Sequence, residues 1–404
     1  MRDANEKDLM SKENQQIADI SEDFIEGLSL NMLKILLQDF TKSSSKKYAP
    51  IFWATDDYRH LGPDYAYDKP ILPELITGRH GKVVQPRIVK SKTVQTARSK
   101  EMAEVFTPSW VCNLQNNQID AVWFGREEVF NREIPGEKGE RSWKPTTGKI
   151  VFPSENSDAS PKDSPKDWKA YVTDVRIEIS CGEAPYVVSR YDATTGAFIP
   201  VERRIGILDR KLRIVSENTT TAEEWFLWAE KAYKATYGYE WQGDNLLLAR
   251  EALLVTLLDY FEAKFHSREL PTEKLEHFAE IVSWNFWQMD GLKGVVPDSC
   301  IEKEEHLPDL FGGDVVNKVV CEGCAKGDID RHNGLYCKIK DWNLVDSRTQ
   351  KPGKIIRFIY TLKSGPMKLD EILTMEESGL PKPEFKQSGF ILKAIVKNTD
   401  FGGE

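Results

Sequence analysis

Residues 178–192 read Glu-Ile-Ser-Cys-Gly-Glu-Ala-Pro-Tyr-Val-Val-Ser-Arg-Tyr-Asp, and this stretch decides the fold that the sequence predicts. The segment 170–179 leads into it with alternating apolar and polar side chains rich in Val, Ile and Tyr, which predicts a strand. Small residues at 180–184 predict a tight turn, and the apolar residues beyond them predict the start of a helix. A strand, a turn and a helix in this order can point backbone N–H groups at a nucleotide-like ligand, which an acid at the strand end can also reach.

The same stretch resembles the S-adenosylmethionine-binding turn of adenine-specific DNA methyltransferases of the restriction–modification type. Both have an acid, any residue, a small residue, Cys, Gly, any residue and a small residue, followed by an aromatic. The family usually has a second glycine where this chain has an alanine at position 184. The resemblance implies an α/β, Rossmann-like methyltransferase fold. It also implies cofactor contacts for Glu178, Ser180, Cys181, Gly182 and Ala184.

A second signature lies upstream, where residues 105–108 read Val-Phe-Thr-Pro before an apolar segment. On the residues alone this pattern predicts the start of a helix, because Thr can cap a helix and Pro is favoured at its first position. It also resembles the motif that packs on the methionine end of the cofactor in the same family. The resemblance therefore adds Phe106, Thr107 and Pro108 to the cofactor site.

Two further acids follow predicted strands. A short apolar strand ends at Asp209, and an acid after the second strand of a nucleotide-binding fold commonly accepts hydrogen bonds from ribose hydroxyls. The alternative for Asp209 is a surface carboxylate at a strand end. A strand is predicted at 237–241, and the Gly-Asp pair that follows it resembles the family's contact to the adenine ring of the cofactor, which implies this role for Asp244.

The segment 280–284 is predicted to be the fourth strand, and it runs into Asn285-Phe286-Trp287-Gln288. In the family this strand ends in Asn/Asp-Pro-Pro-Tyr/Phe. The first side chain and the following backbone carbonyl accept hydrogen bonds from the amino group of the target adenine, and the aromatic residue stacks on the extruded base. The resemblance implies that Asn285 and the backbone of Phe286 hold the amine and that Trp287 stacks. Both prolines are missing here, so the sequence leaves the target base and the reaction open.

Cysteine spacing predicts a metal site. The chain has Cys321 and Cys324 separated by two residues, then His332 and Cys337. Three thiolates and one imidazole can complete the tetrahedral shell of a structural zinc ion. The alternative is four unlinked residues in a small β-rich segment, although closely grouped cysteines are more often metal ligands than disulfides in a cytosolic protein.

Charge is distributed unevenly along the chain. The net charge is −9, which argues against nucleic-acid binding by the whole surface. In contrast, the segment 78–100 contains several Lys and Arg residues and no acidic residue. Lys and Arg side chains can neutralise the phosphates of DNA or RNA. A solvated basic loop is the equally weighted alternative. The candidate phosphate contacts are Arg79, Lys82, Arg87, Lys90, Lys92 and Arg98.

Length and composition predict the organisation of the chain. With 404 residues, of which 40% are hydrophobic and 29% charged, the chain is typical of a soluble globular protein with two or three lobes. No apolar run is long enough for a membrane span, and the N-terminus is polar, which predicts a cytoplasmic protein without a membrane partner. We expect an N-terminal helical and aromatic lobe (1–77), a methyltransferase-like domain (78–295) with a flexible insertion (131–168), and a small zinc-containing C-terminal lobe (296–404).

Together the ordered motifs predict a site-specific, S-adenosylmethionine-dependent DNA methyltransferase that acts on the exocyclic amine of adenine. Such an enzyme would be the modification component of a restriction–modification or phage-defence system, with DNA and a restriction or specificity subunit as partners. The alternative is a non-catalytic DNA-binding component that keeps the fold, which Ala184 and the missing prolines favour. A nuclease is disfavoured because the paired acids and lysine that would hold magnesium at a strand end are not found.

Overall fold

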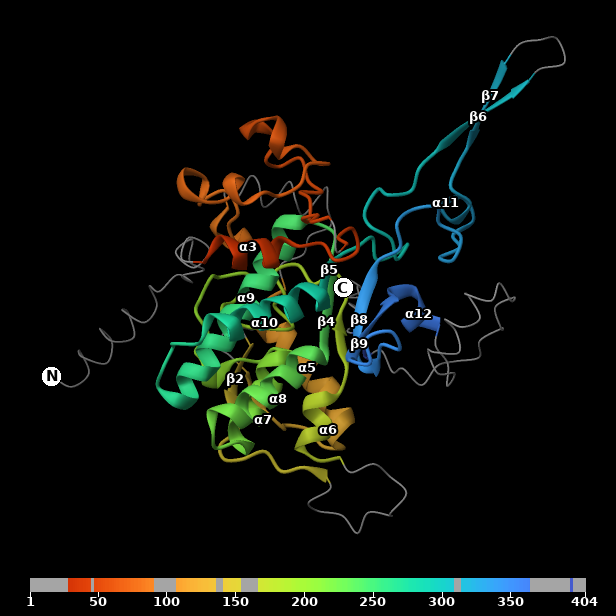
Figure 1. The fold of residues 1–404 in the computed structure, drawn as a ribbon. Coiled ribbons are helices and arrows are strands. Elements are labelled where there is room, and N and C mark those ends of the chain that lie inside the picture. The colour runs from red at the N-terminus through yellow and green to blue at the C-terminus, as the bar shows by residue number, and fades with distance from the viewer. Residues whose placement is uncertain are drawn as a thin grey trace.

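The computed structural model describes residues 28–44, 47–90, 107–135, 141–153, 166–308, 314–363 and 393–394. Within these residues the fold is mixed α/β, as the sequence predicts. A parallel sheet forms the centre, helices pack on one of its faces, and an antiparallel hairpin, β8–β9, lies on the other (Figure 1). A second hairpin, β6–β7, projects away from the body of the molecule.

The helices differ in length, and most lie on one side of the sheet. Their bounds are α3 (Leu30–Leu37), α5 (Ser109–Phe124), α6 (Trp168–Thr173), α7 (Ile207–Asn218), α8 (Ala222–Lys234), α9 (Gly243–Phe265), α10 (Thr272–Asn285), α11 (Glu322–Lys326) and α12 (Phe358–Lys363). The strands are short. Their bounds are β1 (Asn131–Pro135), β2 (Arg141–Pro145), β3 (Arg176–Glu178), β4 (Thr236–Glu240), β5 (Phe286–Gln288), β6 (Lys303–Pro308), β7 (Asp314–Val319), β8 (Lys338–Val345), β9 (Pro352–Arg357) and β10 (Lys393–Ala394).

The order of strands in the central sheet is β10-β3-β4-β5, and every pair is parallel. The chain moves outward from β3 to β4 and β5, and the two-residue strand β10 then pairs on the other side of β3. Because the strands are parallel, their carboxyl ends at Glu178, Glu240 and Gln288 meet at one edge. In open α/β sheets, ligands bind outside the carboxyl ends where the strand order reverses, which here is beside β3.

Both faces of this sheet are buried, because successive side chains of a strand point to opposite faces. On one face Ile177, Tyr239 and Trp287 join a core with residues of β8, β9 and α12, such as Phe358. On the other face Phe286 joins the larger core that the helices build. All eleven residues of β3, β4 and β5 are buried, which is typical of a parallel sheet between two layers.

Several predicted elements are present and others are wrong. The strand expected at 237–241 corresponds to β4, and the helix expected to start after residues 105–108 corresponds to α5. The strand expected at 280–284 is instead the last turn of α10, because its apolar residues continue the helical spacing from Phe278 and face the core. The strand expected before Asp209 is the entry into α7, and the strand expected at 170–179 divides into α6 and β3.

The predicted N-terminal lobe and the predicted insertion lie partly outside the described residues. Of the helical segment expected at the N-terminus, the structure describes α3, and residues 1–27 are not described. The expected insertion at 131–168 contains the β1–β2 hairpin in its described part. Among the described residues, no helix combines the length and apolar composition needed to cross a bilayer.

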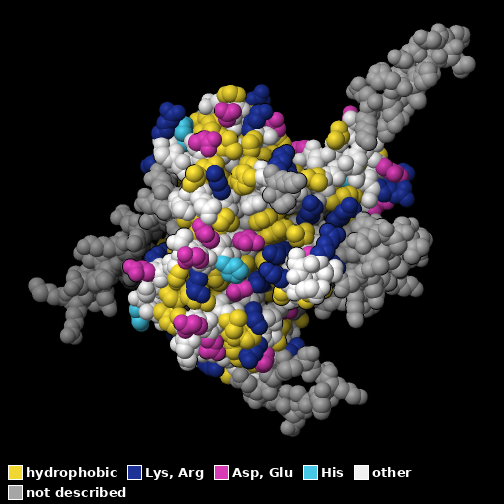
Figure 2. Space-filling model, viewed as in Figure 1, with side chains coloured by type: hydrophobic (Ala, Val, Ile, Leu, Met, Phe, Trp, Pro, Cys, Tyr) yellow, Lys and Arg dark blue, Asp and Glu magenta, His cyan; other side chains and the backbone are white. Residues whose placement is uncertain are grey.

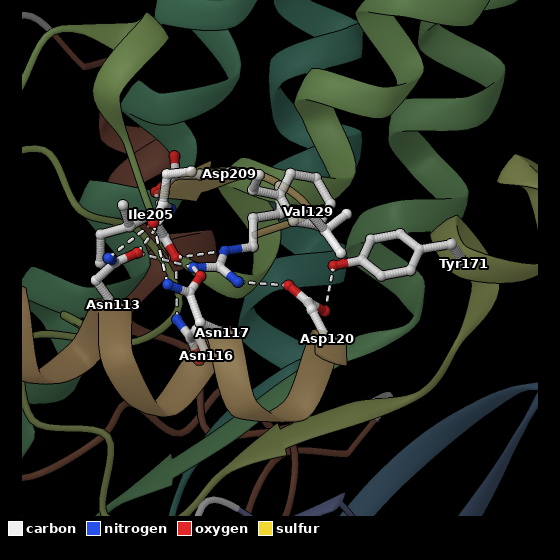
Figure 3. A network of polar contacts seen from close by, with 12 residues as sticks. Asn113, Asn116, Asn117, Asp120, Val129, Tyr171, Ile205 and Asp209 are labelled. Carbon is white, nitrogen blue, oxygen red and sulfur yellow. Dashed lines mark hydrogen bonds and ion pairs between the residues drawn. The ribbon is translucent and has the colours of Figure 1, made fainter. Parts of the chain in front are cut away.

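A buried ionic network joins four elements around Asp120 of α5 (Figure 3). The Asp120 Oδ1 atom accepts hydrogen bonds from Arg176 Nη1 of β3 at 2.9 Å and from the Tyr171 hydroxyl of α6 at 2.7 Å. Its Oδ2 atom pairs with Arg210 Nη1 of α7. All three charged side chains are 1% exposed. Burial opposes ionisation of Asp120, but the two guanidinium groups outweigh it and hold the pKa of this carboxyl below its usual value of 3.8.

Replacing Asp120 by Asn should destabilise the fold by about 3–5 kcal/mol, because two buried guanidinium groups then lose their counter-charge. Since the folded pKa is lowered, the stabilisation is present above about pH 4 and is lost as the pH falls below it. Urea unfolding at neutral pH and at about pH 3 should therefore show a difference that shrinks in acid. The exposed Asp68→Asn variant is the control, and an equal effect of both variants would contradict this account.

Candidate metal centre and the carboxyl edge of the sheet

Four side chains converge beside the base of the β6–β7 hairpin: Cys300, Cys321, Cys324 and His332. Their ligand atoms all lie within 4.8 Å of one another. Each of the three sulfur atoms lies 3.6 Å from Nδ1 of His332. Zinc–sulfur and zinc–nitrogen bonds of about 2.3 and 2.0 Å at tetrahedral angles require a sulfur–nitrogen separation of about 3.5 Å. The cluster therefore has the composition and the spacing of a closed, structural zinc site.

Cys337, predicted as a ligand, lies outside this cluster, and Cys300 stands in its place. The Cys337 thiol is fully buried and contacts the carbonyl oxygen of Gln288 at 3.4 Å, in the core between the sheet and β8–β9. Cys300 was missed because it lies far from the Cys-x-x-Cys pair in the sequence. The β6–β7 hairpin separates Cys300 from Cys321, and its antiparallel pairing brings the two flanking cysteines together.

Local backbone geometry presents the ligands. The Asn333 N–H group donates a hydrogen bond to the Cys321 sulfur at 3.3 Å, and the Asn333 side chain holds both backbone groups of Ile301 at the start of the hairpin. A Cβ atom at Gly323 would lie 2.7 Å from His332 Nδ1, closer than any side chain allows. The glycine inside the Cys-x-x-Cys loop is thus required for the imidazole to approach.

The Cys321 thiol is prepared for metal binding. Burial opposes its ionisation, but hydrogen bonds from the Asn333 and Cys324 N–H groups and the contact with His332 outweigh burial and lower its pKa to about 6. Burial raises the pKa of the Cys300 thiol to about 12. Because the thiolate is the ligand, Cys321 offers a thiolate at neutral pH and a metal ion must displace the proton of Cys300.

The turn after β3 lies at the carboxyl edge of the sheet, and its backbone is unusual. Ser180, Gly182 and Ala184 all have positive φ angles, of 50°, 56° and 62°. Glycine adopts this conformation without strain, so the family's second glycine suits position 184, and Ala184 carries a steric cost there. The Gly182 N–H group donates a hydrogen bond of 2.7 Å to the Glu240 carboxylate at the end of β4. Glu178 is buried at the end of β3, and Cys181 is buried beneath the turn.

Asp209 does not end a strand at this edge, which corrects the prediction. It is the third residue of α7 and is fully buried. Its Oδ2 atom accepts hydrogen bonds from the Ser189 N–H at 2.7 Å and from the Gly206 N–H at 3.0 Å, so its role is to hold the start of the helix. The acid at the end of β4, the strand beside β3, is Glu240.

Asp244 is the second residue of α9 and is also fully buried. Its Oδ2 atom accepts hydrogen bonds from the Tyr58 hydroxyl at 2.7 Å and from Lys90 Nζ at 3.1 Å. These contacts tie the segment 47–90 to the helix. Lys90 is therefore an ion-pair partner rather than a phosphate ligand, which corrects that part of the prediction.

The remaining predicted contacts are divided between exposed, buried and undescribed positions. Arg87 is 3% exposed and cannot reach a phosphate, whereas Arg79 and Lys82 are exposed. Thr107 is buried two residues before α5, and Pro108 occupies the N-cap position of this helix without a side-chain cap hydrogen bond. Other predicted contacts lie outside the described residues, namely Lys92, Arg98 and Phe106.

The predicted catalytic segment lies at the wrong edge of the sheet. Asn285 ends α10 and precedes β5, so it lies at the amino edge, whereas Cys181 lies at the carboxyl edge. Its Nδ2 atom donates to the carbonyl oxygens of Tyr233 and Thr236 at 2.9 and 3.0 Å, and its Oδ1 atom accepts from Trp342 Nε1 at 2.8 Å. With 1% exposure, Asn285 connects α10 to the three residues that it hydrogen-bonds and has no access to a nucleobase.

Its two neighbours are equally enclosed. Trp287 is 4% exposed and packs against Tyr239 and Phe358 on the face covered by β8–β9. Phe286 is 1% exposed, and its carbonyl oxygen accepts hydrogen bonds from Arg250. Cys181 and the predicted catalytic residues are therefore not brought together, and Trp287 has no free face on which a base could stack.

Comparison with protein-family models, with curated proteins and with solved structures finds no match for this chain. Its function must therefore be argued from the geometry of the metal centre and of the sheet edge.

Zinc should bind in a one-to-one ratio, and Cys300→Ser should weaken it by at least about tenfold because a thiolate ligand is lost. Cys337→Ser should leave zinc affinity unchanged and lower only stability, since Cys337 lies in the apolar core. Competition with a chromophoric chelator measures both affinities, and cobalt substitution reports the number of thiolates. Loss of zinc in the Cys337 variant with retention in the Cys300 variant would contradict the ligand set.

Asn285→Ala should destabilise the protein by about 3 kcal/mol, because three buried backbone and side-chain partners lose a hydrogen bond. Urea unfolding provides the measurement. An unchanged stability would show that the buried contacts of Asn285 contribute little, contrary to its assignment as a joint between α10, β4 and β8.

Proposed function

We propose that the chain binds S-adenosylmethionine at the carboxyl edge of the sheet and methylates the exocyclic amine of adenine in DNA. One observation carries the proposal: the turn after β3 hydrogen-bonds through the Gly182 N–H to Glu240, the acid that ends the adjacent strand. A turn after the first strand and an acid after the second form the nucleotide site of open α/β sheets, and they lie here beside the point where strand order reverses.

Each element of this edge has a role that its chemistry suits. Glu240 occupies the position from which an acid accepts hydrogen bonds from ribose hydroxyls. Asp290 follows β5, the strand beyond β4 in the sheet, and takes the adenine-contacting role that the sequence suggested for Asp244. The Asp290 Oδ1 atom accepts from the N–H groups of Leu292 and Lys293, which fixes the carboxylate at the edge.

The reaction needs positioning more than acid–base chemistry. S-adenosylmethionine supplies a methyl group on a positively charged sulfur, and a neutral amine attacks it directly. Holding the two reactants in line can lower the barrier by about 7–11 kcal/mol. The residues of the edge would hold the donor, and the zinc-containing lobe and the exposed cations Arg79 and Lys82 would contact DNA.

A non-catalytic DNA-binding component is the second candidate, and the burial of Asn285 favours it. Within the described ranges, the residues predicted to receive the base amine are enclosed at the opposite edge of the sheet. In this case the chain would bind the cofactor or DNA without turnover. Either function fits a modification component that acts beside a restriction or specificity subunit.

Calorimetric titration with S-adenosylmethionine tests the proposed site. Glu240→Ala should weaken binding by about 10- to 100-fold, since hydrogen bonds to a charged group contribute about 1.5–3 kcal/mol. Glu240→Gln keeps an acceptor for Gly182 and should weaken binding less. The exposed Glu223→Ala variant of α8 is the matched control and should bind as the wild type does.

Labelled methyl transfer to assorted duplexes separates the two candidates. Transfer to adenine supports the methyltransferase, and cofactor binding without transfer supports the binding component. Absence of cofactor binding by the wild-type chain would overturn the proposal.

A further inference from the structure

A cleft of about 470 Å³ opens where the N-terminus of α5 meets β2 and the segment 192–203. It lies away from the metal centre and is not lined by any residue of the predicted basic segment. The residues that decide its chemistry are Trp110, Trp143, Phe198, Arg141, Arg203 and Asp192.

The floor of the cleft is closely packed. Trp143 and Ile199 belong to a buried apolar cluster that includes Cys112 of α5 and Tyr186 of the segment after β3. The Trp143 Nε1 atom donates a hydrogen bond of 2.8 Å to the carbonyl oxygen of Arg203, which joins β2 to the far wall. The cleft is therefore a preformed feature of the fold.

Two arginines stand against aromatic rings in this cleft. The Arg141 guanidinium lies 5.3 Å from the centre of the Trp110 ring, and that of Arg203 lies 5.7 Å from the Trp143 ring. Both arginines are exposed, and neither forms an ion pair with a described residue. Phe198 is 46% exposed in the same wall. Aromatic faces and cations are thus presented to solvent together.

The one acidic residue among the lining residues is engaged elsewhere. The Asp192 Oδ2 atom accepts from the Ser109 N–H at 2.7 Å at the start of α5, and its Oδ1 atom accepts from the N–H groups of Thr194 and Thr195 at 2.9 Å each. Burial opposes ionisation, but these hydrogen bonds outweigh it and lower the pKa of Asp192. Asp192 is therefore a carboxylate that is held by N–H groups of the wall, and with the two arginines the lining keeps a net positive charge.

We propose that this cleft binds a single-stranded segment of nucleic acid, with a base stacked on Phe198 or Trp110 and its flanking phosphates paired with Arg141 and Arg203. Single strands are bound by such a combination, because an unpaired base offers a ring face and its backbone offers phosphates. A duplex offers phosphates while its base faces stay stacked. On the face drawn in Figure 2, acidic and basic side chains are interspersed, which agrees with nucleic-acid contacts confined to local sites.

The inference goes beyond methyl transfer and needs no cofactor. It holds equally for an enzyme that acts on an extruded base and for a protein that only binds an opened strand. An acidic peptide is the competing ligand, because it could pair with both arginines without stacking.

Fluorescence anisotropy with a labelled oligothymidylate, without cofactor, tests the cleft on the full chain. Arg141→Glu and Arg203→Glu should each weaken binding by about tenfold, and Phe198→Ala by about fivefold or more, the loss expected for one stacked base. Lys144→Glu changes the same charge at an exposed position of the same strand β2, does not line the cleft, and should stay within about twofold of the wild type. A duplex of equal length should bind more weakly than the single strand.

Three results would overturn the proposal. They are an absence of single-strand binding by the wild type, an equal loss in the Lys144 control, and competition by polyglutamate as strong as that by unlabelled oligothymidylate. Circular dichroism of each variant confirms folding, and since Phe198 is exposed, its variant keeps the test valid if an arginine variant misfolds.

Discussion

The fold depends on a carboxylate that is surrounded by protein and shared by two guanidinium groups. Asp120 of α5 holds Arg176 of the first strand and Arg210 of α7, and Tyr171 of α6 completes the set. Removing such charges from water is costly, so the arrangement is stable only when all of its partners are present. This requirement fixes α5 against β3. It thereby fixes both the turn that follows β3 and the cleft at the N-terminus of α5.

The turn after β3 has a strained backbone, and it lies at the carboxyl edge of the sheet. Three residues between 180 and 184 hold positive φ angles, and two of them are not glycine. Such strain persists only where surrounding structure enforces it, as the Gly182–Glu240 hydrogen bond and the burial of Cys181 do here. The strained backbone therefore marks the same edge that the strand order marks independently.

Sequence patterns predicted correctly the residues whose partners lie nearby in the sequence. They were wrong for residues whose partners lie far away in the sequence. The Cys321, Cys324 and His332 spacing predicts three ligands because one loop carries them, whereas Cys300 becomes a ligand only when the β6–β7 hairpin closes. The apolar run before Asn285 fits a strand and a buried helix equally well, since only the packing of α10 distinguishes them. One helical turn of error at that point moved a predicted catalytic residue to the opposite edge of the sheet.

The candidate metal centre and the sheet edge are linked through a short chain of contacts. The Tyr336 hydroxyl accepts from the His332 N–H at 2.9 Å, and Tyr336 pairs with Val295, which in turn pairs with Asp290 after β5. A ligand backbone, a bridge residue and an edge carboxylate thus follow one another within hydrogen-bond reach. A metal ion held by the four ligands would fix the first of these, and backbone pairing connects it to the last. The small lobe is therefore better understood as a support for the third strand's carboxyl end than as a separate appendage.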